Sequence, residues 1–212
     1  DAQACCKALG CSYEVISINR AMKAFENILL GLSGVAHENM QSRARGVILM
    51  SLSNQTGAMV LTTGNKSEIA VGYTTLYGDM CGGFNILKDV YKTYVYTLSE
   101  WRNALSPVIP ERIIAKAPSA ELRANQTDQD SLPSYDTLDA ILDGLIERDL
   151  GVDDLVVEGH AKDLVLKVNR LLDLAEYKRR QSAPGPKISA RPFGRERRYP
   201  ITNGYRFVIE KA

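Results

Sequence analysis

The chain has 212 residues, of which 45% are hydrophobic and 24% are charged, and its formal net charge is +1. This length allows one hydrophobic core, or one core with a small appendage, and the near-neutral balance argues against nucleic acid or an acidic membrane surface as a partner. No segment approaches the roughly 18 uncharged apolar residues of a membrane helix, and the spacing of the four cysteines fits neither a disulfide framework nor a zinc site, so we expect a cytoplasmic protein with reduced thiols.

The first 63 residues predict helices and strands in alternation. Residues 1–9 carry small and apolar residues at helical spacing, and residues 13–18 have the composition of a strand. Residues 21–32 predict a second helix. Residues 39–52 predict a third, with an apolar face formed by Met40, Ala44, Val47, Ile48 and Leu52. Residues 58–63 form a short apolar run that fits a strand buried on both faces.

A helix predicted over residues 66–73 completes the pattern of a doubly wound α/β fold with a parallel sheet. Residues 90–103 predict another helix, residues 120–133 a polar loop, and residues 135–159 and 162–177 further helices. From 178 to 198 the chain is basic and rich in proline and glycine. We therefore predict an α/β core at 1–134, with a helical and basic C-terminal extension of the same domain at 135–212.

The segment after the second predicted strand has the pattern of a phosphate site. In an open parallel sheet, ligands bind beyond the carboxyl ends of the strands, where loops lead into helix N-termini. Thr63 would lie at that edge, and Glu68 would lie in the first turn of the next helix. A purely structural alternative stays open, because Asn65 followed three residues later by Glu68 is also the spacing of a helix capping box.

Two other segments carry candidate functional groups. Asp79 lies among Gly78, Gly82 and Gly83, where it could bind a metal, accept a proton or simply make a turn, and Lys92 follows as a candidate phosphate contact or a solvated charge. Asn39 and Arg43 are four residues apart and share one helix face, where they could hold a carboxylate or a ribose.

Several segments in order resemble the signature segments of bacterial NAD synthetases: Glu-Asn-Met-Gln-Ser-Arg-Ala-Arg-Gly from residue 38, Leu-Thr-Thr-Gly-Asn-Lys-Ser-Glu-Ile-Ala-Val-Gly-Tyr from 61, Tyr-Gly-Asp-Met-Cys-Gly-Gly-Phe from 77, Ala-Pro-Ser-Ala-Glu-Leu from 117, and Glu-Tyr-Lys-Arg-Arg-Gln from 176. The match runs from about residue 1 to 198. It implies the ATP-pyrophosphatase form of a Rossmann-like fold. It also implies a reaction in which ATP adenylates the nicotinate carboxylate of deamido-NAD, pyrophosphate leaves, and ammonia displaces AMP, with Mg²⁺ as the metal.

Carried over position by position, the resemblance implies ATP contacts at Thr63, Lys92 and Ser119. It implies deamido-NAD contacts at Asn39, Arg43, Glu68 and Lys178. Glu68 would alternatively be a ligand of Mg²⁺. Asp79 matches an acidic residue near the metal and the incoming ammonia, so Asp79 and Lys92 are the candidate catalytic residues.

Departures from the family pattern favour its glutamine-using branch. Ammonia-using members have a lysine and an aspartate where this chain has Leu76 and Gly83. A nitrilase-like glutaminase domain and the family's Ser-Gly-Gly-x-Asp-Ser phosphate loop are expected upstream of Asp1, so we expect the chain alone to be inactive, and we expect a homodimer or higher homo-oligomer. Two alternatives remain: another ATP-pyrophosphatase amidotransferase synthetase, and a non-catalytic fragment.

Overall fold

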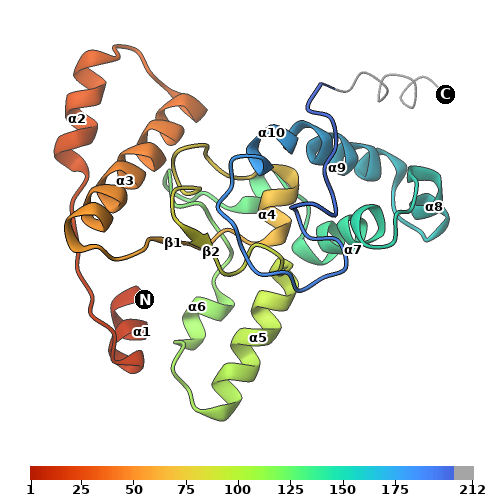
Figure 1. Cartoon of the computed structure of the whole chain (residues 1–212), viewed down its shortest axis with the longest axis horizontal. Helices are drawn as coiled ribbons and strands as arrows, with labels where there is room; N and C mark the ends of the chain where they lie inside the picture. The colour runs from red at the N-terminus through yellow and green to blue at the C-terminus, as the bar shows by residue number, and fades with distance from the viewer. Residues whose placement is uncertain (203–212) are drawn as a thin grey trace.

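The structure is a computed structural model that describes residues 1–202, and Figure 1 shows its elements. The first part contains α1 (Ala2–Leu9), α2 (Asn19–Ile28), α3 (Gly34–Thr56), β1 (Leu61–Thr62), α4 (Lys66–Val71) and β2 (Phe84–Asn85). The second part contains α5 (Lys92–Leu105), α6 (Glu111–Ala115), a 3-10 turn η1 (Asp128–Asp130), α7 (Tyr135–Ile146), α8 (Val152–Val157), α9 (Lys162–Leu174) and α10 (Glu176–Arg179).

The two strands form a parallel sheet in which Leu61 pairs with Phe84 and Thr62 pairs with Asn85. The predicted strand at 13–18 is wrong, because that segment is irregular and exposed, with Val15 at 76% exposure. No other described strand lies beside it, and an unpaired strand leaves its backbone groups unsatisfied. The strand predicted over 58–63 is shortened to two residues, and the expectation that it is buried on both faces fails at Leu61, which is 49% exposed.

The main core lies where α4 packs against α5, α7 and α9, with α8 packed on α9 and α7. Its members are spaced three and four residues apart, so each of the longer helices presents one apolar stripe to α4. The fully buried side chains of this core include Leu138, Ile141, Leu142, Ile146, Leu155, Val165, Val168 and Leu172. The helix predicted over 135–159 divides into α7 and α8, since Asp149 adopts a left-handed conformation with φ 58° between them.

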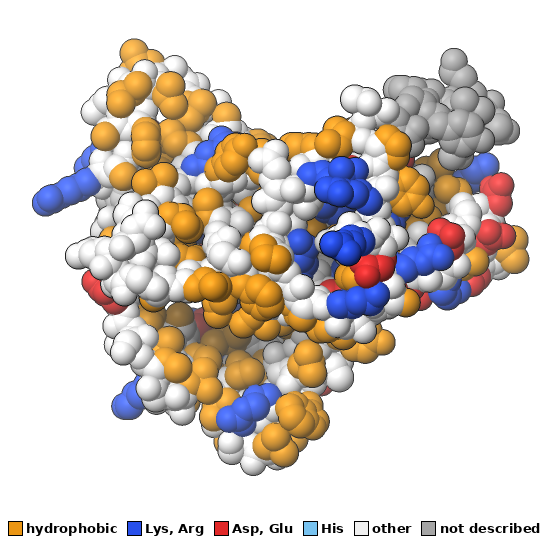
Figure 2. All heavy atoms as spheres, in the orientation of Figure 1, with side chains coloured by type: hydrophobic (Ala, Val, Ile, Leu, Met, Phe, Trp, Pro, Cys, Tyr) orange, Lys and Arg blue, Asp and Glu red, His pale blue; other side chains and the backbone are white. Residues whose placement is uncertain are grey.

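A second, smaller core joins α2 to α3 through Met22, Met40 and Ala44. Two of these belong to the apolar face predicted for residues 39–52, but Val47 of that face stays 63% exposed. Ile28 and Leu30 are also exposed, and Figure 2 shows hydrophobic side chains gathered over the lobe of α2 and α3. Among residues 1–202, no helix has both the length and the apolar content needed to cross a membrane.

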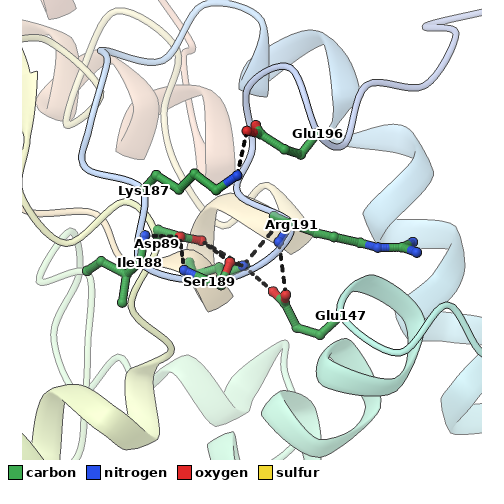
Figure 3. A network of polar contacts seen from close by, with 8 residues as sticks. Asp89, Glu147, Lys187, Ile188, Ser189, Arg191 and Glu196 are labelled. Atoms are coloured by element: carbon green, nitrogen blue, oxygen red, sulfur yellow. Dashed lines mark hydrogen bonds and ion pairs between the residues drawn. The ribbon is translucent and has the colours of Figure 1, made fainter.

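A buried lysine fastens the C-terminal tail to α4. Lys66, the first residue of α4, is fully buried, and its Nζ donates to Asp89 Oδ1 at 2.7 Å, to Glu147 and to Ser189 Oγ at 2.7 Å. Asp89 also accepts the backbone N–H of Ser189 at 2.6 Å, and Glu147 accepts that of Arg191 at 3.1 Å. Figure 3 shows the tail turning around these two carboxylates, which fixes its path across the molecule.

Candidate active site

Two adjoining cavities lie at the carboxyl end of the sheet. The first, of about 440 Å³, is bounded by α4, α5, α6 and the segment 116–121. The second, of about 580 Å³, lies between the start of α3, the loop 72–79, the segment 120–126 and α10. Tyr73, Asp79 and Ala120 line both cavities, so the two spaces meet at these residues.

Glu68 lies in the first cavity and has two partners. The capping-box interpretation is confirmed, because Glu68 N–H donates to Asn65 Oδ1 at 3.0 Å and Asn65 N–H donates to Glu68 Oε2 at 3.3 Å. The other carboxylate oxygen, Oε1, lies 3.2 Å from Lys92 Nζ. Burial raises the pKa of Glu68, and the Lys92 ammonium acts against that rise. Capping therefore leaves one oxygen of Glu68 directed at a cation in the cavity.

Lys92 is placed by the way α5 begins. Its backbone N–H donates to Ser67 Oγ at 2.9 Å, and the N–H and hydroxyl of Thr93 both donate to Asp139 Oδ2 at 2.9 Å. Side chains from α4 and α7 thus satisfy the free N–H groups of the first turn of α5. The Lys92 ammonium lies 5.4 Å from the centre of the Tyr135 ring, a cation–π distance, and is directed into the first cavity.

The loop that carries Asp79 packs directly on α3. Asp79 Oδ1 accepts the Thr75 N–H at 2.6 Å, and Asp79 N–H donates to Ser42 Oγ at 3.1 Å. A Cβ at Gly78 would lie 2.2 Å from Ser42 Oγ, so this close approach requires glycine. Asn39 Oδ1 accepts the Thr75 hydroxyl at 2.8 Å. Partial desolvation raises the pKa of Asp79, whereas its Thr75 hydrogen bond and Lys178 lower it.

The structure places the predicted site residues, with the exception of Arg43, around the two cavities. Thr63, Glu68, Asp79, Lys92 and Ser119 line the first cavity. Asn39 and Lys178 join Asp79 in the second cavity.

Lys178 Nζ donates to two carbonyl oxygens of the loop, Gly72 O at 2.7 Å and Thr74 O at 2.6 Å, and burial lowers its pKa. Arg43 is exposed, donates from Nε to Leu76 O at 3.1 Å, and lines neither cavity. Arg43 therefore supports the loop in this conformation without facing the cavities.

Sequence reasoning missed three polar residues around the first cavity. The Tyr135 hydroxyl donates to Asp128 Oδ2 at 2.7 Å, while the buried Asp128 Oδ1 has no hydrogen-bond partner within residues 1–202. Burial and the nearby Asp128 raise the pKa of Tyr73 to about 12. Tyr73 ends the family-like segment from residue 61, but no spacing rule brings residues so far apart in sequence to one cavity.

The arrangement supplies an ammonium and carboxylates in one cavity, with an amide and a second lysine in the next. A cation beside buried carboxylates suits a phosphate chain, alone or with a metal ion, since charge on phosphate needs cations around it. Within residues 1–202, no group of three or more histidine, cysteine and carboxylate side chains is placed to hold a metal by itself. Two ligands can react where the cavities meet, at Asp79.

Comparisons with known proteins agree on one family. The family model described as NAD synthase matches residues 1–182. A glutamine-dependent NAD(+) synthetase of Xanthomonas campestris is 57% identical over 210 residues, which cover 94% of this chain and 38% of that protein. The structure of a glutamine-dependent NAD+ synthetase from Acinetobacter baumannii in complex with ADP is 49% identical, has a TM-score of 0.54, and is matched over 96% of this chain and 38% of its own.

A glutamine-dependent NAD(+) synthetase structure from Cytophaga hutchinsonii, at 24% identity, has a TM-score of 0.73 over 99% of this chain and 37% of its own, a likeness of fold alone. These matches confirm the family resemblance and the α/β class with a parallel sheet expected from the sequence. The chain spans a little over one third of the length of these relatives, 38% for the Xanthomonas protein.

Proposed function

Because the chain belongs to the NAD synthase family, we propose that it forms the synthetase part of a glutamine-dependent NAD synthetase, a ligase that makes NAD from deamido-NAD, ATP and ammonia. The observation that carries this proposal is the meeting of the two cavities at Asp79. An adenylation followed by an amidation needs a nucleotide in one space and a carboxylate substrate in the next, with the reacting atoms in reach of both.

ATP occupies the first cavity in this proposal. Lys92 contacts its phosphates, and Thr63 and Ser119 bound the same cavity. The ADP bound to the Acinetobacter baumannii relative supports an adenine nucleotide as ligand. Attack of the nicotinate carboxylate on the α-phosphate expels pyrophosphate. The Lys92 ammonium stabilises the charge that grows on the phosphate oxygens.

Deamido-NAD occupies the second cavity, where Asn39 and Lys178 are placed to contact it. Ammonia then displaces AMP from the adenylated carboxyl carbon and loses a proton as the amide forms. Asp79 lies between the cavities, and its raised pKa makes it a better proton acceptor than an ordinary aspartate. Arg43 reaches this substrate only through a change of side-chain conformation, since it faces Leu76.

Mg²⁺ fits the first cavity, where Glu68 and the unpartnered Oδ1 of Asp128 would hold it. This ion usually takes one or two protein carboxylates and completes its shell with phosphates and water. When bound, it would neutralise charge on the phosphate chain of ATP. The names of the relatives support glutamine as the source of the ammonia, which in this proposal is released by a glutaminase domain of the same protein. We also propose that the protein acts in the cytoplasm as a homodimer or higher homo-oligomer.

The test uses the full-length product of the gene that encodes this chain. NAD formation is followed with deamido-NAD, ATP and Mg²⁺, supplied with glutamine in one arm and ammonium in another. We expect turnover in both arms and release of AMP and pyrophosphate. Turnover of xanthosine monophosphate in place of deamido-NAD would show another amidotransferase synthetase. No turnover of either substrate would contradict the proposal and favour a non-catalytic role.

A further inference from the structure

A third, strongly basic cavity lies on the other side of α10 from the proposed active site. Its volume is about 270 Å³. Six basic side chains line it: Lys88, Arg179, Arg180, Arg195, Arg197 and Arg198. Figure 2 shows lysine and arginine side chains gathered over this part of the molecule, where the tail passes α10, with some acidic side chains among them.

The lining contains one carboxylate, and that carboxylate is already engaged. Glu176 Oε2 accepts from Arg179 Nη2 at 2.8 Å, and Glu176 Oε1 accepts from Arg180 Nε at 2.7 Å. Asp173 and Asp149 act on Arg197 electrostatically but do not line the cavity. The cavity therefore keeps a large excess of positive charge.

Arg197 places a buried, charged donor at this cavity. Its side chain is buried, with the residue 9% exposed, and Nη1 has no hydrogen-bond partner within residues 1–202. The guanidinium lies 4.2 Å from the centre of the Tyr199 ring, which fixes its orientation. Burial lowers the pKa of Arg197. A buried, charged donor without an acceptor is unfavourable, and an oxyanion beside it would remove that penalty.

Lys88 is a second buried cation in the lining of this cavity. It is buried, its Nζ donates to the carbonyl oxygen of Ala183 at 2.7 Å, and no carboxylate pairs with it among the described residues. Burial lowers the pKa of Lys88 as well. Two buried cations from separate segments, the β2–α5 connection and the tail, thus border one small space.

The basic cavity shares no lining residue with either cavity of the proposed active site. Consecutive residues at the end of α10 separate the two regions: Lys178 lines the second active-site cavity, while Arg179 and the C-cap residue Arg180 line the basic cavity. Binding of ATP or deamido-NAD in the proposed active site therefore does not account for this cluster of basic side chains.

We propose that this basic cavity is a binding site for a small phosphate-bearing anion, distinct from the site of NAD synthesis. Several guanidinium groups around one compact space match the oxygen geometry of phosphate, which accepts paired N–H donors from arginine. The cavity is small compared with the usual range for organic ligands, which favours inorganic phosphate or pyrophosphate over a nucleotide.

Isothermal titration of the full-length gene product with inorganic phosphate, and separately with pyrophosphate, tests the proposal. Chloride at matched ionic strength is the blank, which separates specific binding from general screening. We expect saturable binding at one site. The variant Arg195→Gln/Arg198→Gln removes two exposed lining charges, so it should fold normally and weaken binding by about tenfold or more. Lys162→Gln, an exposed lysine at the start of α9, is the matched control and should bind normally.

Other outcomes would overturn the proposal. Unchanged affinity in the double variant, or no binding above the chloride blank, means that the cavity holds no such anion. Loss of phosphate binding in Lys92→Ala instead would place the ion in the first active-site cavity.

Discussion

Lys92 Nζ lies 3.2 Å from Glu68 Oε1, while the other carboxylate oxygen of Glu68 accepts the backbone N–H of Asn65. One side chain therefore caps α4 and also faces a cation of the first cavity. Both side chains are largely buried: that of Glu68 is 17% exposed and that of Lys92 is 19% exposed. The two roles depend on different properties of Glu68, hydrogen-bond geometry for the cap and negative charge for the cavity, so mutation can separate them.

Glu68→Gln keeps the capping box, because glutamine can make the same reciprocal hydrogen bond. We expect a nearly unchanged melting temperature but a fall in NAD formation by about a hundredfold, on the order of 3 kcal/mol, since one preorganised charge is lost. Lys92→Ala should lower the rate likewise. Steady-state kinetics and thermal melting of the full-length protein measure both effects. Near-normal rates in both variants would leave Glu68 with the capping role alone.

Lys178→Met should raise the KM for deamido-NAD more than the KM for ATP. Lys178 lines the second cavity, and its ammonium holds the loop 72–74 through two carbonyl oxygens. Methionine keeps the length of the side chain but loses the charge and the donors. Lys162→Met serves as the control. Equal changes in both KM values would argue that Lys178 stabilises the site as a whole, without a preference for either substrate.

Lys66→Met should destabilise the protein by about 3–5 kcal/mol, because it leaves the buried carboxylate of Asp89 and the partly buried carboxylate of Glu147 without their cation. Urea unfolding measures the loss. The double variant Lys66→Met/Asp89→Asn should recover part of it, since one uncompensated charge is removed. A single-variant cost below about 1 kcal/mol, the range of exposed ion pairs, would contradict the assigned role of the network.

Stability should fall as the pH drops through the acid range. Burial alone would raise the pKa of Asp89, but hydrogen bonds from Lys66 and Ser189 outweigh it and hold the pKa below the ordinary 3.8. Burial would also raise the pKa of Glu176, but hydrogen bonds from Arg180 and Arg179 outweigh this effect and hold that pKa below the ordinary 4.5. As the pH falls, these two carboxylates therefore take up protons in the unfolded chain before they do so in the folded protein. Their contribution to stability is complete at pH values above their ordinary pKa values, and it is lost as the pH falls toward their lower pKa values in the folded protein.

Urea midpoints at neutral pH and at several acidic pH values measure this slope. Asp89→Asn removes one of the titrating groups and should flatten it. Stability that stays constant through the acid range, or an unchanged slope in the variant, would show that these carboxylates are not selectively ionised in the folded state.

We expect the α2–α3 lobe to form a two-fold dimer interface. Val47 is 63% exposed and Ile28 is 73% exposed, which leaves apolar area on a lobe whose own core is small. Sedimentation at micromolar concentration should show a dimer, and Val47→Glu should shift it toward monomer. Val157→Glu, at an 87% exposed position of α8, is the matched control. Monomer alone in the parent protein would contradict this interface.

Periodicity located the helices well, because a helix makes its hydrogen bonds within itself. The helix predicted over 39–52 is observed as α3, extended at both ends to Gly34–Thr56. The prediction began this helix too late, although serine, the residue type of Ser33 just before α3, is favoured at the N-cap position. The strand predicted at 13–18 failed for the opposite reason, since a strand depends on a neighbour that a local pattern does not reveal.

Some parts of the candidate site follow from a local sequence pattern, and other parts depend on the packing of the whole fold. The capping box at Asn65 and Glu68 follows from a spacing of three residues and is confirmed. The pairing of Tyr135 with Asp128, and the support of α5 by Asp139, depend on how α7 packs in the core. No local rule predicts such contacts. The family resemblance brought Thr63, Lys92 and Ser119 together before the fold was known, and the structure places them around one cavity.

The Lys66 network also affects the order in which contacts form while the protein is being synthesised. Ser189 follows Lys66 by 123 residues, so at typical translation rates the ribosome delivers it on the order of ten seconds later. During that interval a nascent α4 has a lysine at its first buried position and lacks the tail groups that surround it. Burying that charge early is unfavourable. The helices that pack on α4 therefore complete their packing only after Ser189 and Arg191 have emerged, so the tail is the last of these contacts to form around Lys66.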